Sequence, residues 1–140
     1  MSRVETFDHT ADLGLRVHAG DLSELFRSAA EGLFGIIMAN PEAIRPRQSE
    51  RIAISAEDPE DLLVAWLSEL LFLCETKHRL YGEFDVSIQE DGKSLTATIQ
   101  GEPIDRERHI LDHEVKAVTR HELSVRREGL GWVAEVIVDI

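Results

Sequence analysis

The sequence has few of the features that place a protein outside a reducing, aqueous compartment. Its 140 residues include a single cysteine, Cys74, which excludes an intramolecular disulfide framework and a zinc site built from several cysteines. The longest apolar run is only a few residues, whereas a membrane-spanning helix needs roughly 20. The N-terminus also lacks the apolar segment of a secretory signal. We therefore expect a cytoplasmic protein that does not associate with membranes.

Basic residues are scarce relative to acidic ones. The chain has 15 Lys and Arg residues against 27 Asp and Glu residues, which gives a formal net charge of −12. Nucleic-acid binding depends largely on basic side chains that neutralise phosphates, and the basic clusters here are short and interrupted by acids. The composition thus argues against direct, high-affinity binding of RNA or DNA. An acidic surface suits a basic protein partner or a bound cation instead.

The remaining composition is that of a globular protein. Apolar residues make up 43% of the chain and charged residues 30%, close to the averages for soluble domains. The length is sufficient to bury a hydrophobic core, and no repeat or flexible linker divides the chain. We therefore predict one domain that spans residues 1–140.

The first predicted helix covers residues 22–37, where apolar residues recur with the period of an α-helix. Asp21 is the expected N-cap, and Glu24 follows three residues later, as in a capping box. Asn40-Pro41 provides a stop signal. Met38 falls at a position that we expect to be in the core.

The second predicted helix follows the cap residue Asp58, and its apolar pattern runs as far as Cys74. Pro59 occupies the first helical position, where its missing N–H group costs nothing. Trp66 lies on the apolar stripe and is expected in the core. Cys74 lies on the same stripe, so we interpret it as a small core residue, since buried thiols are usually inert.

Most of the remaining chain alternates apolar and polar residues with the period of two that is typical of half-buried strands. Asp91-Gly92 and Glu128-Gly129 have the composition of hairpin turns. Because helices do not alternate with strands, the pattern favours an α+β fold, a mainly antiparallel sheet with two amphipathic helices packed on it. The expected strands include residues 13–17, 52–54, 84–88, 95–99, 115–118, 123–125 and 132–138.

Common catalytic motifs are missing from the sequence. It has no glycine-rich phosphate loop, no nucleophile elbow and no zinc-binding H-E-x-x-H helix. His109 and His113 are four residues apart, which on a helix would place two metal ligands together. No amphipathic pattern supports a helix there, so we favour a structural or solvent-facing role for both. The residues alone therefore offer no standard catalytic site.

Two polar features are not explained by core packing. The segment Asp8–Gly14 precedes a predicted strand, and its simplest role is an Asx-type turn. At the other end, Asp139 interrupts an apolar run and is followed by the carboxylate of Ile140. If Asp12 lay beside this end, several carboxylate oxygens would converge and require a hard cation such as Ca²⁺ or Mg²⁺. Spacing alone does not establish that contact, so both interpretations remain open.

The same two features belong to a set of motifs that resembles the archease family. Phe7-Asp8-His9-Thr10-Ala11-Asp12-Leu13-Gly14 looks like the F-x-H-T-A-D-[IL]-G opening of that family. The resemblance covers essentially the whole chain, with one departure at Arg120, where the family more often has an aromatic residue before the histidine. Further matching motifs lie at residues 24–26, 30–34, 62–71, 101–103, 114–119, 131–132 and 138–140.

The resemblance implies an accessory role in RNA ligation rather than a catalytic one, so we expect that the protein is not an enzyme. Archeases assist the RtcB-type RNA ligase, which joins RNA 3′-phosphate or 2′,3′-cyclic phosphate ends to 5′-hydroxyls in tRNA splicing and RNA repair. Their implied role is to promote the GTP-dependent guanylylation of the ligase and so restore multiple turnover. The family's metal site maps onto Asp12, Asp139 and Ile140. We expect Ca²⁺ there, because an oxygen-only cage tolerates its loose geometry better than Mg²⁺ requires.

Partner contacts and alternative functions remain open at this point. His9, Glu114 and Lys116 are candidate contact residues, although the last two would serve equally well as a salt-bridged pair on a strand. One alternative function is a chaperone-like specificity factor for a tRNA-modifying enzyme such as a methyltransferase. Another is a metal-dependent hydrolase that uses Asp12 and Asp139, for which His9 is the only candidate base.

Overall fold

The computed structural model describes residues 2–9 and 12–140, without the side chains of residues 8 and 9. Across these residues, no helix combines the length and the apolar character that crossing a membrane requires. The elements in chain order are β1 (Arg3–His9), β2 (Asp12–Ala19), α1 (Leu22–Ile37), the 3₁₀ turn η1 (Pro41–Ala43), β3 (Gln48–Ser55), α2 (Pro59–Lys77), β4 (Arg79–Ile88), β5 (Ser94–Pro103), β6 (Ala117–Val118), β7 (Ser124–Glu128) and β8 (Gly131–Asp139).

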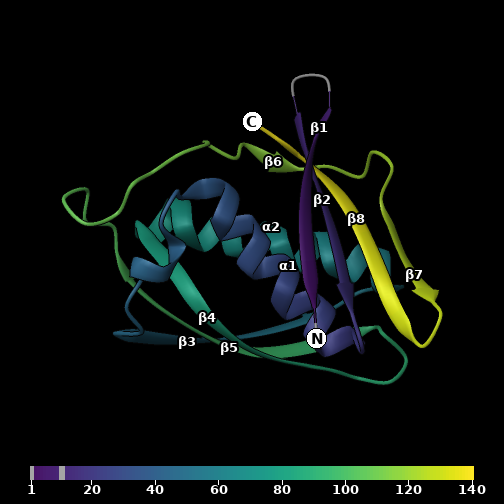
Figure 1. Ribbon diagram of the computed structural model, residues 1–140. Coiled ribbons are helices and arrows are strands. Elements are labelled where there is room, and N and C mark those ends of the chain that lie inside the picture. Colours follow the sequence, from purple (N-terminus) through teal and green to yellow (C-terminus); the bar gives the residue numbers. More distant parts are fainter. Residues whose placement is uncertain (1, 10–11) are drawn as a thin grey trace.

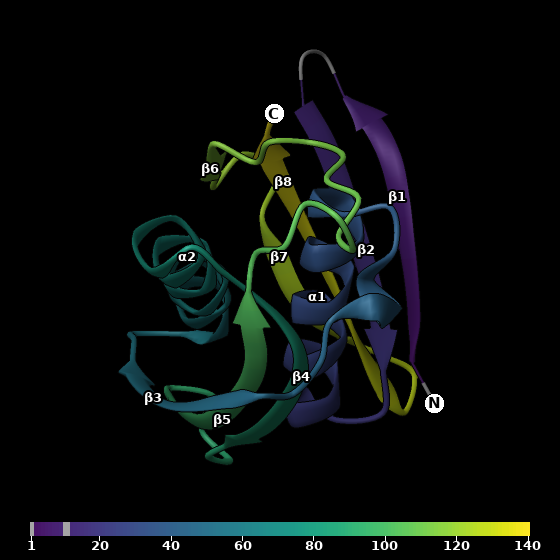
Figure 2. The ribbon, with the colours of Figure 1, turned by 90° about the vertical axis from the view of Figure 1, so that its left-hand side faces the viewer.

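The strands form two antiparallel sheets rather than one (Figure 1). The larger sheet has the order β1-β2-β8-β6, with β7 also paired to β8, and the smaller sheet has the order β3-β5-β4. Both helices contact strands of both sheets, so the helices and the two sheets share one hydrophobic cluster. In Figure 2, α1 runs beside β2 and β8 of the larger sheet. The predicted α+β class is confirmed, whereas the division into two sheets was not predicted.

Both helices begin at their predicted caps. The side chains of Asp21 and Asp58 each accept a hydrogen bond, at 2.8 Å, from the main-chain N–H three residues later. Helix α1 ends where the pattern predicts, and α2 continues to Lys77. Val64 and Leu73 flank the predicted apolar stripe of α2 and are also buried. The buried face of α2 is therefore wider than predicted, because this helix contacts both sheets.

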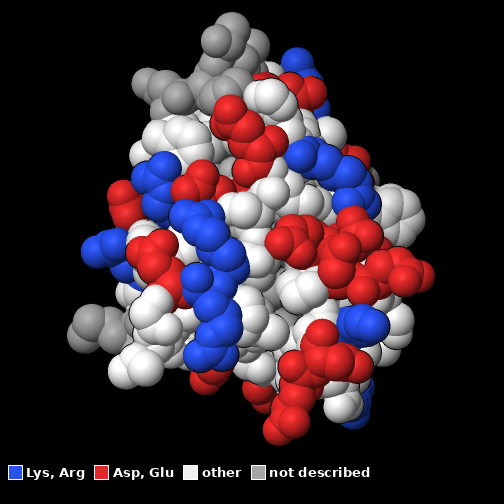
Figure 3. Space-filling model, turned by 90° about the vertical axis from the view of Figure 1, so that its right-hand side faces the viewer, with Lys and Arg blue, Asp and Glu red and all other residues white. Residues whose placement is uncertain are grey.

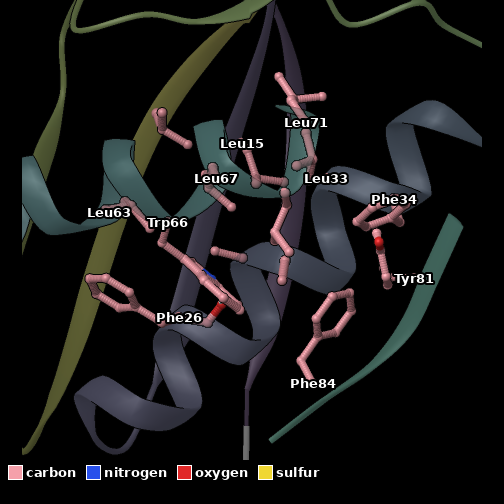
Figure 4. Packing of buried hydrophobic residues seen from close by; sticks show 14 of the residues in the cluster. Leu15, Phe26, Leu33, Phe34, Leu63, Trp66, Leu67, Leu71, Tyr81 and Phe84 are labelled. Atoms are coloured by element: carbon pink, nitrogen blue, oxygen red, sulfur yellow. The ribbon is translucent and has the colours of Figure 1, made fainter. Parts of the chain in front are cut away.

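Trp66 occupies the centre of the core (Figure 4). Its side chain is fully buried, and its indole N–H donates to the main-chain oxygen of Phe26 on α1 at 2.9 Å. Its ring meets Phe84 of β4 edge to face, with centroids 6.3 Å apart. Met38 is also fully buried. The predicted core roles of both residues are confirmed.

Strand β1 was not predicted from the sequence. It forms one edge of the larger sheet and carries charged residues at Arg3 and Glu5, as edge strands often do to discourage further pairing. Its sequence, RVETFDH, lacks the regular apolar alternation of the other strands, and Val4 is 40% exposed in the structure. Strand β6, in contrast, is shorter than predicted and contains only two residues.

The connection between β5 and β6 is anchored by a buried carboxylate. The Glu102 side chain, 2% exposed, accepts the main-chain N–H of Arg45 at 2.8 Å and forms an ion pair with Arg108. It also lies 2.9 Å from Nε2 of His109. Because Nδ1 of His109 accepts the main-chain N–H of Asp105 at 2.9 Å, the ring proton lies on Nε2, which donates to Glu102. The structural role predicted for His109 is thus confirmed, and no helix forms in this connection.

These contacts determine the ionisation of Glu102. Burial alone would raise the pKa of its carboxyl. The hydrogen bonds from Arg45, His109 and Arg108 have a larger, opposite effect, so the pKa falls from the ordinary value of 4.5 to about 2. A group with a lowered pKa in the folded state stabilises the fold above its unfolded pKa. That stabilisation is lost as the pH falls from about 4.5 towards 2.

We predict that Glu102→Gln lowers the free energy of unfolding by roughly 3 kcal/mol at pH 7, because the variant loses a charge held by three donors. The difference from wild type should narrow steadily below pH 4.5, the ordinary pKa of the group. Denaturant unfolding at several pH values measures this. Glu83→Gln, at an exposed position on β4, is the matched control and should change stability by no more than about 0.5 kcal/mol. A difference for Glu102→Gln that stayed constant down to pH 2 would contradict the ionic role.

Candidate metal site at the ends of strands β2 and β8

Two aspartates lie opposite each other at the end of the two central strands of the larger sheet. Asp12 begins β2 and Asp139 ends β8, and the two residues are direct partners in the antiparallel register. Side chains at such positions have Cβ atoms roughly 4.5–5.5 Å apart, where like charges destabilise the pair. Ile140 follows Asp139, and its half-buried side chain packs against the core. The structure therefore brings together the three residues predicted as metal ligands, and their metal-binding role remains a prediction.

The register between β2 and β8 fixes this arrangement. It runs through eight successive pairs, from Asp12 with Asp139 to Ala19 with Trp132. Leu13 and Val138 form the adjacent pair and pack in the core, so the aspartates fall on the opposite face of the sheet. A shift of one residue would move one aspartate to the core face, at the cost of burying a charge.

Further main-chain pairing holds Asp139 from the other side. The main-chain N–H of Lys116 donates to the main-chain oxygen of Asp139 at 2.7 Å, and Ala117 of β6 is its register partner. The end of β8 is thus fixed between β2 and β6 near the top of Figure 1, where the C-terminus is marked. The Asp139 side chain is exposed, and that of Asp12 is half-buried.

The predicted contact residue His9 belongs to the same row. It is the register partner of Asp12 on β1, so His9, Asp12 and Asp139 occupy successive strands at one level of the sheet. The His9 side chain lies outside the described residues. Thr10 and Ala11, which the resemblance includes in the same motif, also lie outside them.

The next row of the sheet is covered by an aromatic ring. Phe7, Gly14 and Ile137 are successive register partners on β1, β2 and β8. The Phe7 ring lies directly over Gly14, because a Cβ atom at Gly14 would approach the ring to 2.0 Å. The guanidinium of Arg16 lies 4.9 Å from the centroid of the same ring. Ile137 is only 1% exposed although it lies on the outer face of the sheet. The phenylalanine and glycine of the opening motif therefore form one packed unit beside the aspartates.

Charges alternate in the row beyond this ring. Arg16 lies between Glu5 and Glu135, with N–O distances of 3.7 and 3.1 Å, and Glu135 is also 3.7 Å from Arg126. Figure 3 shows acidic and basic side chains interleaved on the side of the molecule that it presents. In contrast, the row of Asp12 and Asp139 places two carboxylates opposite each other. The first of these two rows therefore places opposite charges next to each other, and the second places two acidic residues opposite each other.

The side chains that the structure describes contain no group of three or more His, Cys, Asp or Glu residues suited to a metal ion. A cation at the paired aspartates therefore needs a further donor beside them, such as the carboxylate of Ile140. Such a donor set consists of oxygen atoms alone, which suits Ca²⁺ or Mg²⁺. The residues present thus fit a hard divalent cation.

Glu114 and Lys116 lie before β6, in the connection from β5, and both are exposed. The alternative interpretation of these residues as a salt-bridged pair on a strand is wrong, because the strand begins only at Ala117. In the described part of the chain, no ion pair joins them. Glu114 also lines a pocket that the sequence did not indicate.

The fold and the paired aspartates define an α+β protein with an acidic site at the end of its larger sheet. The sequence model of the archease protein family (MTH1598/TM1083) matches residues 5–140. The chain is 38% identical to "Protein archease" of Pyrococcus furiosus over 143 residues and 39% identical to that of Methanothermobacter thermautotrophicus over 142 residues, with all of both chains covered in each case. The chain therefore belongs to the archease family.

Solved structures agree with this assignment. The solution structure of Methanobacterium thermoautotrophicum protein 1598 is 35% identical, with a TM-score of 0.80 and 98% of both chains covered. A crystal structure of a Thermotoga maritima protein, described as an archease and possible chaperone, has a TM-score of 0.69 over 97% of this chain and 96% of its own. Because that protein is only 19% identical, it supports the fold alone.

We predict that Gly14→Ala displaces the Phe7 ring and lowers the free energy of unfolding by about 1–3 kcal/mol, as overpacking commonly does. Thermal or denaturant unfolding measures this effect. Gly35→Ala is the matched control, because a Cβ atom at Gly35 has no neighbour within 4 Å. That control should stabilise the exposed helical position by roughly 0.5–1 kcal/mol. Equal effects of the two substitutions would show that the ring does not pack on Gly14.

Proposed function

We propose that this protein is a non-enzymatic accessory factor of an RtcB-type RNA ligase in tRNA splicing and RNA repair. It would promote the GTP-dependent guanylylation of the ligase and thereby allow multiple turnover in the cytoplasm. Membership of the archease family supports an accessory role. The observation that supports the proposal is the cross-strand register that places Asp12 opposite Asp139 at the end of the sheet.

We further propose that Asp12, Asp139 and the carboxylate of Ile140 bind one divalent cation, with Ca²⁺ preferred. The two aspartates are register partners, and the packing of Ile140 against the core keeps the adjacent main chain in place. Bound there, the cation would neutralise the carboxylates and offer a positive charge to an anionic group of the partner. The residues of this chain would orient it at the rim of the sheet, where a large partner can reach it.

The charge distribution supports binding to a protein rather than to RNA. The chain carries a net charge of −12, and the basic side chains on the outer face of the larger sheet are paired with acids. A ligase that binds RNA needs a basic surface for the phosphates. An acidic accessory protein can approach such a surface quickly and reversibly without itself retaining the RNA.

Two alternative functions make different requirements of the structure. A hydrolase that used Asp12 and Asp139 would need a concavity for its substrate, but neither residue lines the pocket of about 690 Å³ described below. A specificity factor for a tRNA methyltransferase would share the acidic surface and the fold. The two accessory functions differ in the partner enzyme, so the assay of ligation separates them.

The proposed function predicts that the protein restores turnover to a limiting amount of its cognate RtcB-type ligase. The assay contains GTP, a divalent metal and RNA with a 3′-phosphate and a 5′-hydroxyl end. Product should exceed one equivalent of ligase only when the protein is present, and the protein alone should yield no joined RNA and no covalent nucleotide adduct. Asp12→Asn should reduce activation at least tenfold, whereas Asp85→Asn, at an exposed position on the other sheet, should not. Ligation that is indifferent to the protein would disprove the proposal.

The metal site predicts different Ca²⁺ affinities for two tagged forms of the chain. A C-terminal tag converts the Ile140 carboxylate into a peptide carbonyl and removes one negative charge from the site, whereas an N-terminal tag leaves it intact. Calorimetric titration should give at least tenfold weaker Ca²⁺ binding to the C-terminally tagged form. Equal affinities would remove Ile140 from the site, and an absence of binding to both forms would remove the site itself.

A further inference from the structure

A preformed pocket of about 690 Å³ lies between the C-terminal half of α2 and the connection from β5 to β6. This volume lies within the range of ligand-binding clefts. Its inner surface is apolar and includes Ile37, Leu71 and Leu80, which are buried, together with the side chains of Ile104 and Leu111. Neither the paired aspartates nor the Phe7 ring lines it.

Main-chain hydrogen bonds fix the outer wall of this pocket. The N–H of Asp112 donates to the oxygen of Ile37 at the end of α1 at 2.8 Å. Leu111 forms an isolated bridge with Met38, and the N–H of Ile104 donates to the oxygen of His78 at 2.9 Å. Figure 1 shows the connection as a long trace around the side of the molecule where α1 ends. The pocket is therefore built by anchored segments.

Acidic residues outnumber Lys and Arg at the rim of the pocket. Glu75, Asp112 and Glu114 line it with Arg106, and the remaining polar side chains of the rim belong to His78 and His113. Ile110, on the same connection, has 60% of its surface exposed and adds apolar area beside the acidic groups. An apolar floor with an acidic rim is complementary to a segment that carries an aliphatic side chain flanked by Lys or Arg.

The pocket and the paired aspartates are connected through one short segment. Glu114 lines the pocket, and two residues later the main-chain N–H of Lys116 binds the main-chain oxygen of Asp139. A partner that places one segment in the pocket can therefore bring a second region to the aspartates. Because the segment between them is fixed at both ends, its two binding features are held in a constant relative position.

We propose that this pocket is a second docking site for the RNA ligase, which would insert an aliphatic side chain flanked by basic residues. This inference rests on the proposed function. The pocket supplies affinity and orientation, while the aspartate site acts on the guanylylation step. Loss of the pocket should therefore raise the concentration of protein needed for activation without lowering the activation reached at saturation.

The first test compares two double charge reversals with identical net charge. Asp112→Lys with Glu114→Lys alters the rim of the pocket, and Glu83→Lys with Asp85→Lys alters exposed positions on β4. The rim variant should need at least tenfold more protein for half-maximal activation, with Ca²⁺ affinity and maximal activation retained. The β4 variant should behave like wild type. Equal shifts in the two variants, or none in the rim variant, would overturn the docking site while leaving the proposed function intact.

The second test uses the chain's single cysteine as a reporter. Cys74 lines the pocket and is half-buried, and burial raises the pKa of its thiol to about 11. Its alkylation by N-ethylmaleimide is therefore slow and sensitive to access, and mass spectrometry can follow it at this residue. Saturating ligase should slow the reaction at least fivefold, and the rim variant should show no protection at the same ligase concentration. An unchanged alkylation rate with bound ligase would overturn the proposal, and failure of wild type to bind ligase would overturn the proposed function with it.

Discussion

The antiparallel pairing of β2 with β8 is the interaction on which the rest of the structure depends. It joins the second strand of the chain to the last one through eight successive pairs and forms the centre of the larger sheet. Strands β1, β6 and β7 all pair with one of these two strands. The same register places Asp12 beside Asp139 on the outer face of the sheet. It places the alternating apolar residues of β2 and β8 on the opposite face, in the core. Fold and candidate site therefore have one common cause.

The carboxylate of Glu102 and those of Asp12 and Asp139 lie in different environments. Glu102 is buried, and donors from Arg45, Arg108 and His109 satisfy it from within the fold. Its charge consequently stabilises the native state, and it anchors the connection that forms one wall of the pocket. Asp12 and Asp139 are instead register partners at the end of the sheet, where we propose that a cation binds. The first arrangement serves stability, and the second is proposed to serve binding.

The local structure could be predicted from the sequence, but the contacts between distant segments could not. The caps at Asp21 and Asp58 and the core position of Trp66 follow from short-range patterns, and the structure confirms them. The convergence of Asp12 and Asp139 depends on a long-range register that no local pattern encodes. The burial of Glu102 had no local signal either, because the residues that satisfy it lie on other segments. Strand β1 was missed since its charged residues mark an edge rather than a buried strand.

The position of β8 in the sheet has a consequence for how the protein is made on the ribosome. Strand β2 is synthesised early, but β8, with which it pairs at the centre of the sheet, is the last of the described strands in chain order. Until then, β2 has only β1 beside it, and one of its edges stays open to other chains. Closure of so long a loop is slow relative to the formation of helices and hairpins. The aspartate pair can therefore assemble only after β8 has been synthesised, and a chain that ended before β8 would lack the pair.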